Sequence, residues 1–131
     1  VKNGGQWTAP TVWQTRDVSM YMNSGVLSGD LLFGFSHLKK GQLFCLDAAT
    51  GAVKWLGSPR QGENAAMLAS RSNLVILLND GELIVAKPTA QSYQEIRRYT
   101  VAENQTWAHP IILADGVIVR DSKNLIRWST R

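Results

Sequence analysis

The sequence contains little cysteine and no long run of apolar residues. Cys45 is its only cysteine, and a single thiol excludes both an internal disulfide framework and a metal site built from several cysteines. The longest aliphatic run, Leu74–Leu78, has five residues, whereas a helix needs about 20 residues to cross a bilayer. We therefore expect no membrane span, and no signal peptide that begins at Val1.

Charge is also scarce and is not concentrated. Charged residues make up 18% of the 131 positions and hydrophobic residues 44%, a balance that is too apolar for a disordered chain. The net charge is +4, yet only Lys39-Lys40 and Arg97-Arg98 are adjacent basic pairs. Nucleic-acid binding normally requires a basic cluster, or basic residues interleaved with aromatic ones. We therefore expect no nucleic-acid partner.

What the chain does contain is a repeat of about 42 residues. Trp13 and Trp55, which end two short strand-like runs, lie 42 residues apart. Two further pairs of equivalent positions show the same spacing: Val75 and Val117, and Leu83 and Leu125. An internal repeat of about 40 to 45 residues is typical of the blades of a β-propeller.

Each repeat has the pattern of four short strands separated by turns. In the first copy, Gly41–Asp47 and Ala52–Trp55 are strand-like runs joined by a turn that ends on Gly51, where a left-handed residue is needed. No stretch of ten or more residues keeps a helical period. A four-stranded sheet with two apolar faces must be covered by neighbouring sheets. The sequence therefore predicts an all-β fold of β-propeller blades, with four-stranded antiparallel sheets in about three repeats.

The spacing divides residues 1–131 into one partial propeller. We expect a strand that completes a blade within residues 1–16, a first blade over 17–58 and a second over 59–101. Residues 102–131 then form an incomplete third blade. Its expected strands are Thr106–Ile112, Val117–Arg120 and Leu125–Trp128.

The segment Gly41–Trp55 resembles the repeat of PQQ-like, quinoprotein-type β-propellers. It carries the family pattern Gly-x-Leu-Tyr/Phe-Ala-Leu-Asp-Ala-x-Thr-Gly-x-x-x-Trp, with Cys45 at the first Ala position. The segments Gln61–Ala65 and Thr106–Pro110 resemble the inner-strand starts of bacterial PQQ-like repeat proteins. Most members of this group do not bind the quinone. They act as exported binding or scaffolding modules, as in the lipoprotein of the outer-membrane β-barrel assembly machinery.

Two functions follow from the resemblance. The first is a non-catalytic module that binds a protein or a small ligand, without cofactor or metal, in the periplasm or outside the cell. The alternative is a fragment of a quinone-dependent dehydrogenase. Those enzymes use adjacent cysteines and a calcium site of Glu, Asn and Asp, whereas Cys45 is alone and Glu63-Asn64 has no Asp partner on a matching strand. We therefore favour the non-catalytic module and expect no catalytic residues.

Four residues are candidates for a ligand-binding surface that faces the propeller channel. Trp107 and His109 lie two positions apart, so on a strand they point to the same side. There they would stack on and hydrogen-bond a ligand, a sugar ring included. Glu63 and Asn64 open the first strand of the second repeat and would form a polar rim for a cation or a sugar. The alternatives are a histidine satisfied by its neighbours near a turn and a turn pair at the start of a strand.

The core is expected to lie between blades. Cys45 should be buried and inert, and Trp13 and Trp55 should pack between blades near the outer strands. The apolar residues expected to form the core are Leu43, Val75, Leu77, Leu83, Val117 and Ile126.

The last repeat has three expected strands, and the N-terminal segment has a spare one. Thr11–Trp13 aligns with the fourth strand of the first repeat, Ala52–Trp55, at the 42-residue spacing. Because an open sheet edge invites pairing with another chain, we expect self-association. In this hypothesis the spare strand completes the last blade of another chain, and two chains close a six-bladed ring. The alternative is that the chain pairs with the remaining blades of a longer propeller.

Overall fold

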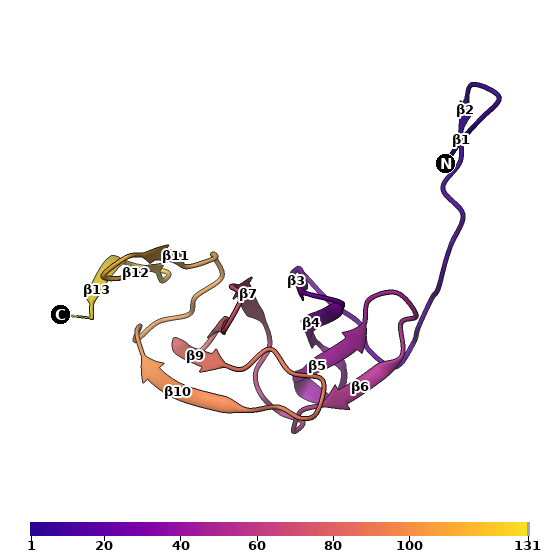
Figure 1. Ribbon diagram of the computed structural model, residues 1–131. Helices are drawn as coiled ribbons and strands as arrows, with labels where there is room; N and C mark the ends of the chain where they lie inside the picture. Colours follow the sequence, from indigo (N-terminus) through magenta and orange to yellow (C-terminus); the bar gives the residue numbers. More distant parts are fainter. Residues whose placement is uncertain (131) are drawn as a thin grey trace.

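The computed structural model describes residues 1–130. Within them, the regular structure consists of antiparallel strands and one 3-10 turn. Three sheets follow one another along the sequence, and within each sheet consecutive strands pair. Figure 1 shows the three sheets side by side in an arc. No helix in residues 1–130 is long and apolar enough to cross a membrane.

The first sheet has the four strands predicted for the first repeat. They are β3 (Val26–Ser28), β4 (Leu31–Ser36), β5 (Gln42–Asp47) and β6 (Val53–Leu56). The 3-10 turn η1 (Leu38–Lys40) lies between β4 and β5. The turn between β5 and β6 forms as its sequence predicts. The Asp47 carboxylate accepts the N–H groups of Ala49 and Thr50 at 3.1 and 3.0 Å, and Gly51 has a φ of 73°.

The second sheet repeats this plan. Its strands are β7 (Ala65–Ala69), β8 (Leu74–Leu78), β9 (Glu82–Ala86) and β10 (Glu95–Thr100). The first strands β3 and β7 contact each other and lie on the concave side of the arc, whereas β6 and β10 lie on the convex side (Figure 1). In a propeller this places the first strands beside the central channel.

The third sheet has three strands, β11 (Ile111–Leu113), β12 (Gly116–Arg120) and β13 (Leu125–Ser129). The prediction of a strand over Thr106–Ile112 is wrong in its first half, because pairing with β12 begins only at Ile111. The reason is Pro110, which has no N–H to donate to a ladder and restricts the residue before it.

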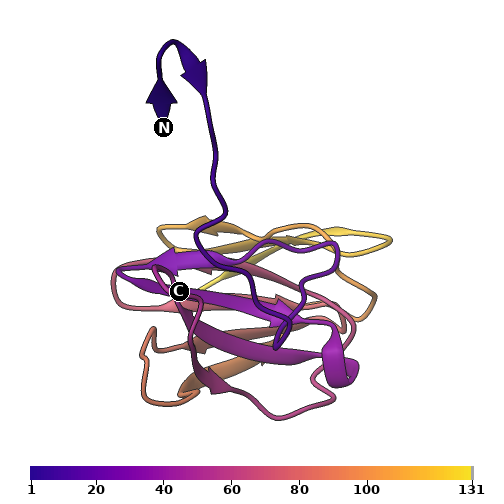
Figure 2. The same ribbon diagram turned by 90° about the vertical axis from the view of Figure 1, so that its right-hand side faces the viewer.

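The N-terminal arm stands apart from the sheets. A two-residue hairpin pairs β1 (Lys2–Asn3) with β2 (Gln6–Trp7), and the arm projects away from the arc in both views (Figure 1 and Figure 2). Residues 11–13 form no strand within the single chain. The sequence predicts that residues 11–13 form a strand by pairing with another chain, and this pairing stays a prediction.

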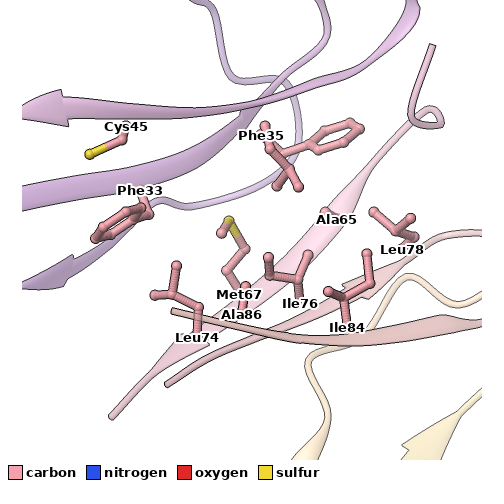
Figure 3. Close-up of a cluster of buried hydrophobic side chains, with 11 residues drawn as sticks. Phe33, Phe35, Cys45, Ala65, Met67, Leu74, Ile76, Leu78, Ile84 and Ala86 are labelled. Atoms are coloured by element: carbon pink, nitrogen blue, oxygen red, sulfur yellow. The ribbon is translucent and has the colours of Figure 1, made fainter. Parts of the chain in front are cut away.

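Two apolar clusters fill the spaces between neighbouring sheets. The first cluster joins the first and second sheets, as Figure 3 shows, and includes Phe33, Phe35, Cys45, Met67, Ile76 and Ile84. The second cluster joins the second and third sheets and includes Leu77, Leu83, Val101, Val117 and Val119. Of the predicted core residues, Leu43 belongs to the first cluster and Leu77, Leu83 and Val117 to the second, while Val75 and Ile126 are partly buried against the second.

Strand β8 contributes to both clusters. Ile76 lies in the first cluster and Leu77 in the second, because successive side chains of a strand point to opposite faces. This explains why the run Leu74–Leu78 is apolar without alternation. The strand is covered on both sides, as the repeat predicts.

Candidate functional site

A cavity of about 550 Å³ opens at the rim shared by the first and second sheets. Its walls are the loop between β4 and β5 and the segment that leads from β6 to β7. The lining residues are His37, Lys40, Arg60, Gly62 and Glu63. Glu63 was predicted from the sequence as a rim residue. The volume of the cavity lies within the range of about 300–1,000 Å³ that is usual for ligand pockets.

The cavity walls are built from backbone in the left-handed conformation. Lys39, Lys40 and Arg60 have φ values of 53°, 64° and 64°, a conformation that costs a residue with a side chain roughly 1–2 kcal/mol. The two walls are tied together by the Arg60 N–H, which donates to the Lys39 carbonyl at 3.1 Å. Backbone strain of this kind is concentrated at functional sites. The three strained residues therefore indicate that a functional site lies at the cavity and not on the sheets.

Gly41 and Gly62 permit the two walls to meet. A Cβ atom at Gly41 would lie 1.9 Å from the Gly62 carbonyl oxygen, a distance that no side chain can adopt. The Gln61 N–H donates to the Gly41 carbonyl at 3.0 Å, which fixes this close approach. The glycines therefore bring Lys40 and Arg60 to the same opening.

His37 is held in one orientation at the cavity. Its Nδ1 and its backbone N–H both donate to the Ser19 carbonyl, at 2.8 and 2.9 Å, and its ring meets the Tyr21 ring edge-on at a centroid distance of 5.9 Å. Because a carbonyl can only accept, Nδ1 carries the proton. The Nε2 atom of the neutral ring is therefore an acceptor, and it becomes a donor when the ring is protonated.

The electrostatic character of the cavity is basic. Lys40 and Arg60 are exposed, and neither takes part in the ion pairs found within residues 1–130, which join Lys54 to Asp47, Arg98 to Glu95 and Arg127 to Asp115. Two cations thus face one carboxylate, that of Glu63. The arrangement favours an anionic group that also carries a hydrogen-bond donor for Glu63.

Glu63 and Asn64 are positioned by Asn79, which follows strand β8. The Asn79 Oδ1 accepts the backbone N–H groups of Glu63 and Asn64 at 3.0 and 3.2 Å, and the Asn79 N–H donates to the Asn64 carbonyl at 3.0 Å. Glu63 is exposed beside the cavity, whereas Asn64 is buried. Glu63 is therefore accessible to a ligand at the cavity, whereas the Asn64 side chain lies inside the protein.

Asn64 links two sheets through its side chain. Its Oδ1 accepts from Asn23 Nδ2 at 2.8 Å, and its Nδ2 donates to the Met22 carbonyl at 3.3 Å. Asn23 lies three residues before β3 and Asn64 directly before β7, so the bond joins the segments that lead into the first strands of successive sheets. Both polar ends of the Asn64 side chain are used inside the protein, and a role in ligand binding stays a prediction.

Trp107 and His109 lie in the irregular segment before β11 and not on a strand. Both are exposed, and neither lines the cavity at Glu63. The segment is anchored by Thr106, whose N–H donates to the Asn79 carbonyl at 3.0 Å and whose hydroxyl donates to the Leu78 carbonyl at 2.6 Å. Asn79 therefore connects the start of the third repeat to Glu63 and Asn64, although the four predicted residues do not form one pocket. Their role as ligand contacts stays a prediction.

The sequence did not identify His37, Lys40 and Arg60 as a site. Each looks like a solvated loop residue when it is considered alone. The available signal was the placement of the cations just before glycines, in Lys40-Gly41 and in Arg60-Gln61-Gly62, because glycine marks positions where backbones approach closely.

Cys45 has no access to this site. Its thiol is fully buried in the first cluster, and burial raises its pKa to about 11 against a smaller opposing effect of Lys54. No group of three or more His, Cys, Asp or Glu side chains with the geometry of a metal site is found within residues 1–130.

Comparisons with known proteins bear on the fold. No protein-family model matches the sequence, and no curated protein matches it. Among solved structures, BamB from Moraxella catarrhalis is similar with a TM-score of 0.63 and 17% identity, over 81% of this chain and 32% of that one. The computationally designed Ika8 protein has a TM-score of 0.46 and 10% identity, over 82% of this chain and 45% of that one. The chain spans less than half of the length of either structure. Together with the sheets described above, the similarity to BamB shows that the chain has the fold of β-propeller blades.

Proposed function

We propose that the chain is a non-catalytic β-propeller module that binds an acidic segment of a partner protein at the basic cavity. The observation that carries the proposal is the convergence of Lys40, Arg60 and His37 on one opening. Left-handed backbone holds Lys40 and Arg60 there, and two hydrogen bonds to the Ser19 carbonyl hold His37. A loop that merely connects two strands has no need of such strain, whereas a binding site gains from prearranged cations. The resemblance of the repeat to exported PQQ-like modules supports a periplasmic or extracellular setting.

The chemistry of the cavity supports a carboxylate as the recognised group. Lys40 and Arg60 supply charged donors, and a charge-assisted hydrogen bond contributes about 1.5–3 kcal/mol. Glu63, on the same wall as Arg60, would accept a hydrogen bond from a backbone N–H of the same ligand. A peptide offers both groups at short spacing, while an isolated carboxylate offers only one.

The test is a calorimetric titration with a short glutamate-rich peptide, its glutamine counterpart and free succinate. We expect the glutamate peptide to bind, with an affinity that falls as salt is added, and the glutamine peptide to bind at least tenfold more weakly. Equal binding of the two peptides would overturn the proposal. Binding of succinate as tight as that of the peptide would point to a small dicarboxylate in place of a partner protein.

Variants locate the binding in the cavity. Arg60→Gly removes a cation at a backbone position that suits glycine, so the fold should persist while affinity falls about tenfold. Arg71→Ala removes the same charge from the exposed turn between β7 and β8 and is the matched control. If Arg71→Ala weakens the peptide as much as Arg60→Gly does, the binding reflects net charge alone.

A further inference from the structure

We infer that the acidic segment of the partner also carries an apolar side chain close to its acidic one, and that Met20, Tyr21 and Met22 bind this side chain. The inference rests on the proposed function, because it extends the contact surface of the basic cavity. The three residues, here called the apolar rim, precede β3 and are 43%, 62% and 73% exposed. A run of large apolar side chains exposed in this way is typical of a surface that binds another molecule.

The apolar rim is anchored at both ends. Before it, the Ser19 N–H donates to the Ser36 Oγ at 3.1 Å, and the Ser19 carbonyl accepts from the His37 N–H at 2.9 Å. After it, the Asn23 Nδ2 donates to the Asn64 Oδ1 at 2.8 Å. The segment between these anchors is therefore fixed, and the fold itself holds the three side chains in solvent.

One end of the apolar rim adjoins the wall of the cavity. Met22 has a φ of 54°, a left-handed conformation that is unfavourable for a residue with a side chain. Its carbonyl accepts from the Asn64 Nδ2 at 3.3 Å, and Asn64 directly follows Glu63, which lines the cavity. Met22 thus shares the strained backbone of Lys40 and Arg60, and strain of this kind is found where a fold arranges a binding site.

The Tyr21 ring joins the apolar rim to the cavity at a second point. It meets the His37 ring edge-on with 5.9 Å between the ring centroids, and His37 lines the cavity. An extended peptide advances roughly 3.3–3.6 Å per residue, so about two residues cover this separation. A peptide whose carboxylate lies in the cavity beside His37 therefore reaches the apolar rim within about two residues.

The side chains of the apolar rim favour an aliphatic or aromatic group. A methionine side chain is flexible and polarisable, and it adapts to apolar groups of different shape. A tyrosine ring offers a rigid apolar face and loses little conformational entropy on binding. Residues 20–22 carry no charge, whereas the cavity beside them is basic. The two surfaces together fit a segment in which a leucine or phenylalanine lies about two residues from a glutamate or aspartate.

The experiment is a calorimetric titration with two glutamate-rich peptides that differ two positions from a glutamate, where one has leucine and the other serine. We expect the leucine peptide to bind about tenfold more tightly, because its side chain is removed from water at the apolar rim. Equal affinities would overturn the inference while leaving the binding of acidic segments at the cavity in place. Failure of both peptides to bind would overturn the proposed function, and this inference with it.

Variants locate the apolar contact. Met22→Gly removes a side chain at a backbone position that suits glycine, and Tyr21→Ala removes the ring. Each should weaken the leucine peptide about fivefold, because part of the apolar contact is lost, and should leave the serine peptide within about twofold. Tyr99→Ala on β10, where the side chain is 51% exposed, is the matched control and should change neither affinity. A preference for leucine that survives both variants would overturn the assignment to the apolar rim.

Light scattering of the chain without peptide tests a second copy of the chain as the occupant of the apolar rim. The inference expects the wild-type and Met22→Gly chains to have the same mass in solution. A wild-type dimer that Met22→Gly converts into a monomer would show that the apolar rim binds another copy, and would overturn the inference.

Discussion

The side-chain amides of Asn23 and Asn64 bond directly to each other, with 2.8 Å between Nδ2 and Oδ1. The two residues lie 41 positions apart and precede the first strands of successive sheets. The Asn23 Nδ2 also donates to the Phe35 carbonyl at 3.1 Å, so one amide joins its own sheet to the next. Blade-to-blade register at the concave side is therefore set by hydrogen bonds as well as by apolar packing.

Asn64→Ala should destabilise the chain by about 1–3 kcal/mol, because it leaves buried partners without their hydrogen bonds. Urea denaturation gives the free energy of unfolding. A double-mutant cycle with Asn23→Ala should show a coupling of about 0.5–3 kcal/mol, the range for residues in one network. Strict additivity of the two substitutions would show that the amide pair contributes nothing specific.

Leu83→Ala should cost about 2–4 kcal/mol, because Leu83 is 7% exposed within the second cluster and the substitution leaves a cavity between sheets. The matched control is Ile96→Ala on the outer strand β10, where the side chain is 41% exposed. There the loss should stay below about 1 kcal/mol. Equal losses at the two positions would mean that the second and third sheets do not pack as described.

Cys45 should resist thiol reagents in the folded chain. With a pKa of about 11, only about one thiol in a thousand is ionised at pH 8, and burial blocks access. Labelling with a chromogenic disulfide reagent should therefore follow the rate of unfolding. Gln91→Cys, at an exposed loop position, provides an internal reference that should react at once. Simultaneous reaction of both thiols would contradict the first cluster.

Asp121 should make the third sheet sensitive to acid. The hydrogen bond from the Asn104 side chain and those from the Lys123 and Asn124 N–H groups hold the pKa of Asp121 at about 2, against the opposing effect of burial. The unfolded value is about 3.9. A lowered pKa stabilises the fold above the unfolded value, and the contribution is lost as the pH falls through about 2.

Asp121→Asn removes the titrating group from this pH window. Thermal unfolding of the wild-type chain between pH 5 and 2 should lose more stability than that of the variant. Parallel pH profiles would show that the carboxylate is not held as the geometry indicates. Asp17→Asn, at an exposed carboxylate near Thr15, is the matched substitution and should leave the profile unchanged.

Much of the fold could be predicted because the repeat carries its own signals. The turn at Gly51 is a local pattern, and it forms in the folded chain as its sequence predicts. The repeat also predicted the outer strand that holds Trp55, whereas residues 11–13 form no strand within the described chain. The apolar run in β8 predicted a strand covered on both faces, which the two clusters confirm. Patterns of this kind survive because every repeat must pack against a neighbour.

The cavity could not be predicted in the same way. It depends on left-handed backbone at Lys39, Lys40 and Arg60, a conformation that residues with side chains adopt only when tertiary contacts impose it. The strand predicted through Trp107 and His109 failed for a local reason, since Pro110 cannot join a ladder. Loop geometry at the cavity is instead decided by contacts between repeats, such as the hydrogen bond from the Arg60 N–H to the Lys39 carbonyl, which the spacing alone does not describe.

The position of β8 in both clusters has a consequence for how the chain comes apart. Each cluster covers one face of this strand. The first or the third sheet can therefore unfold separately, because the second sheet then keeps the cluster on its other face. Unfolding should then begin at the first and third sheets and reach the second sheet last. The slowest-exchanging amides will belong to β8, and the stability recorded there will be that of the whole array.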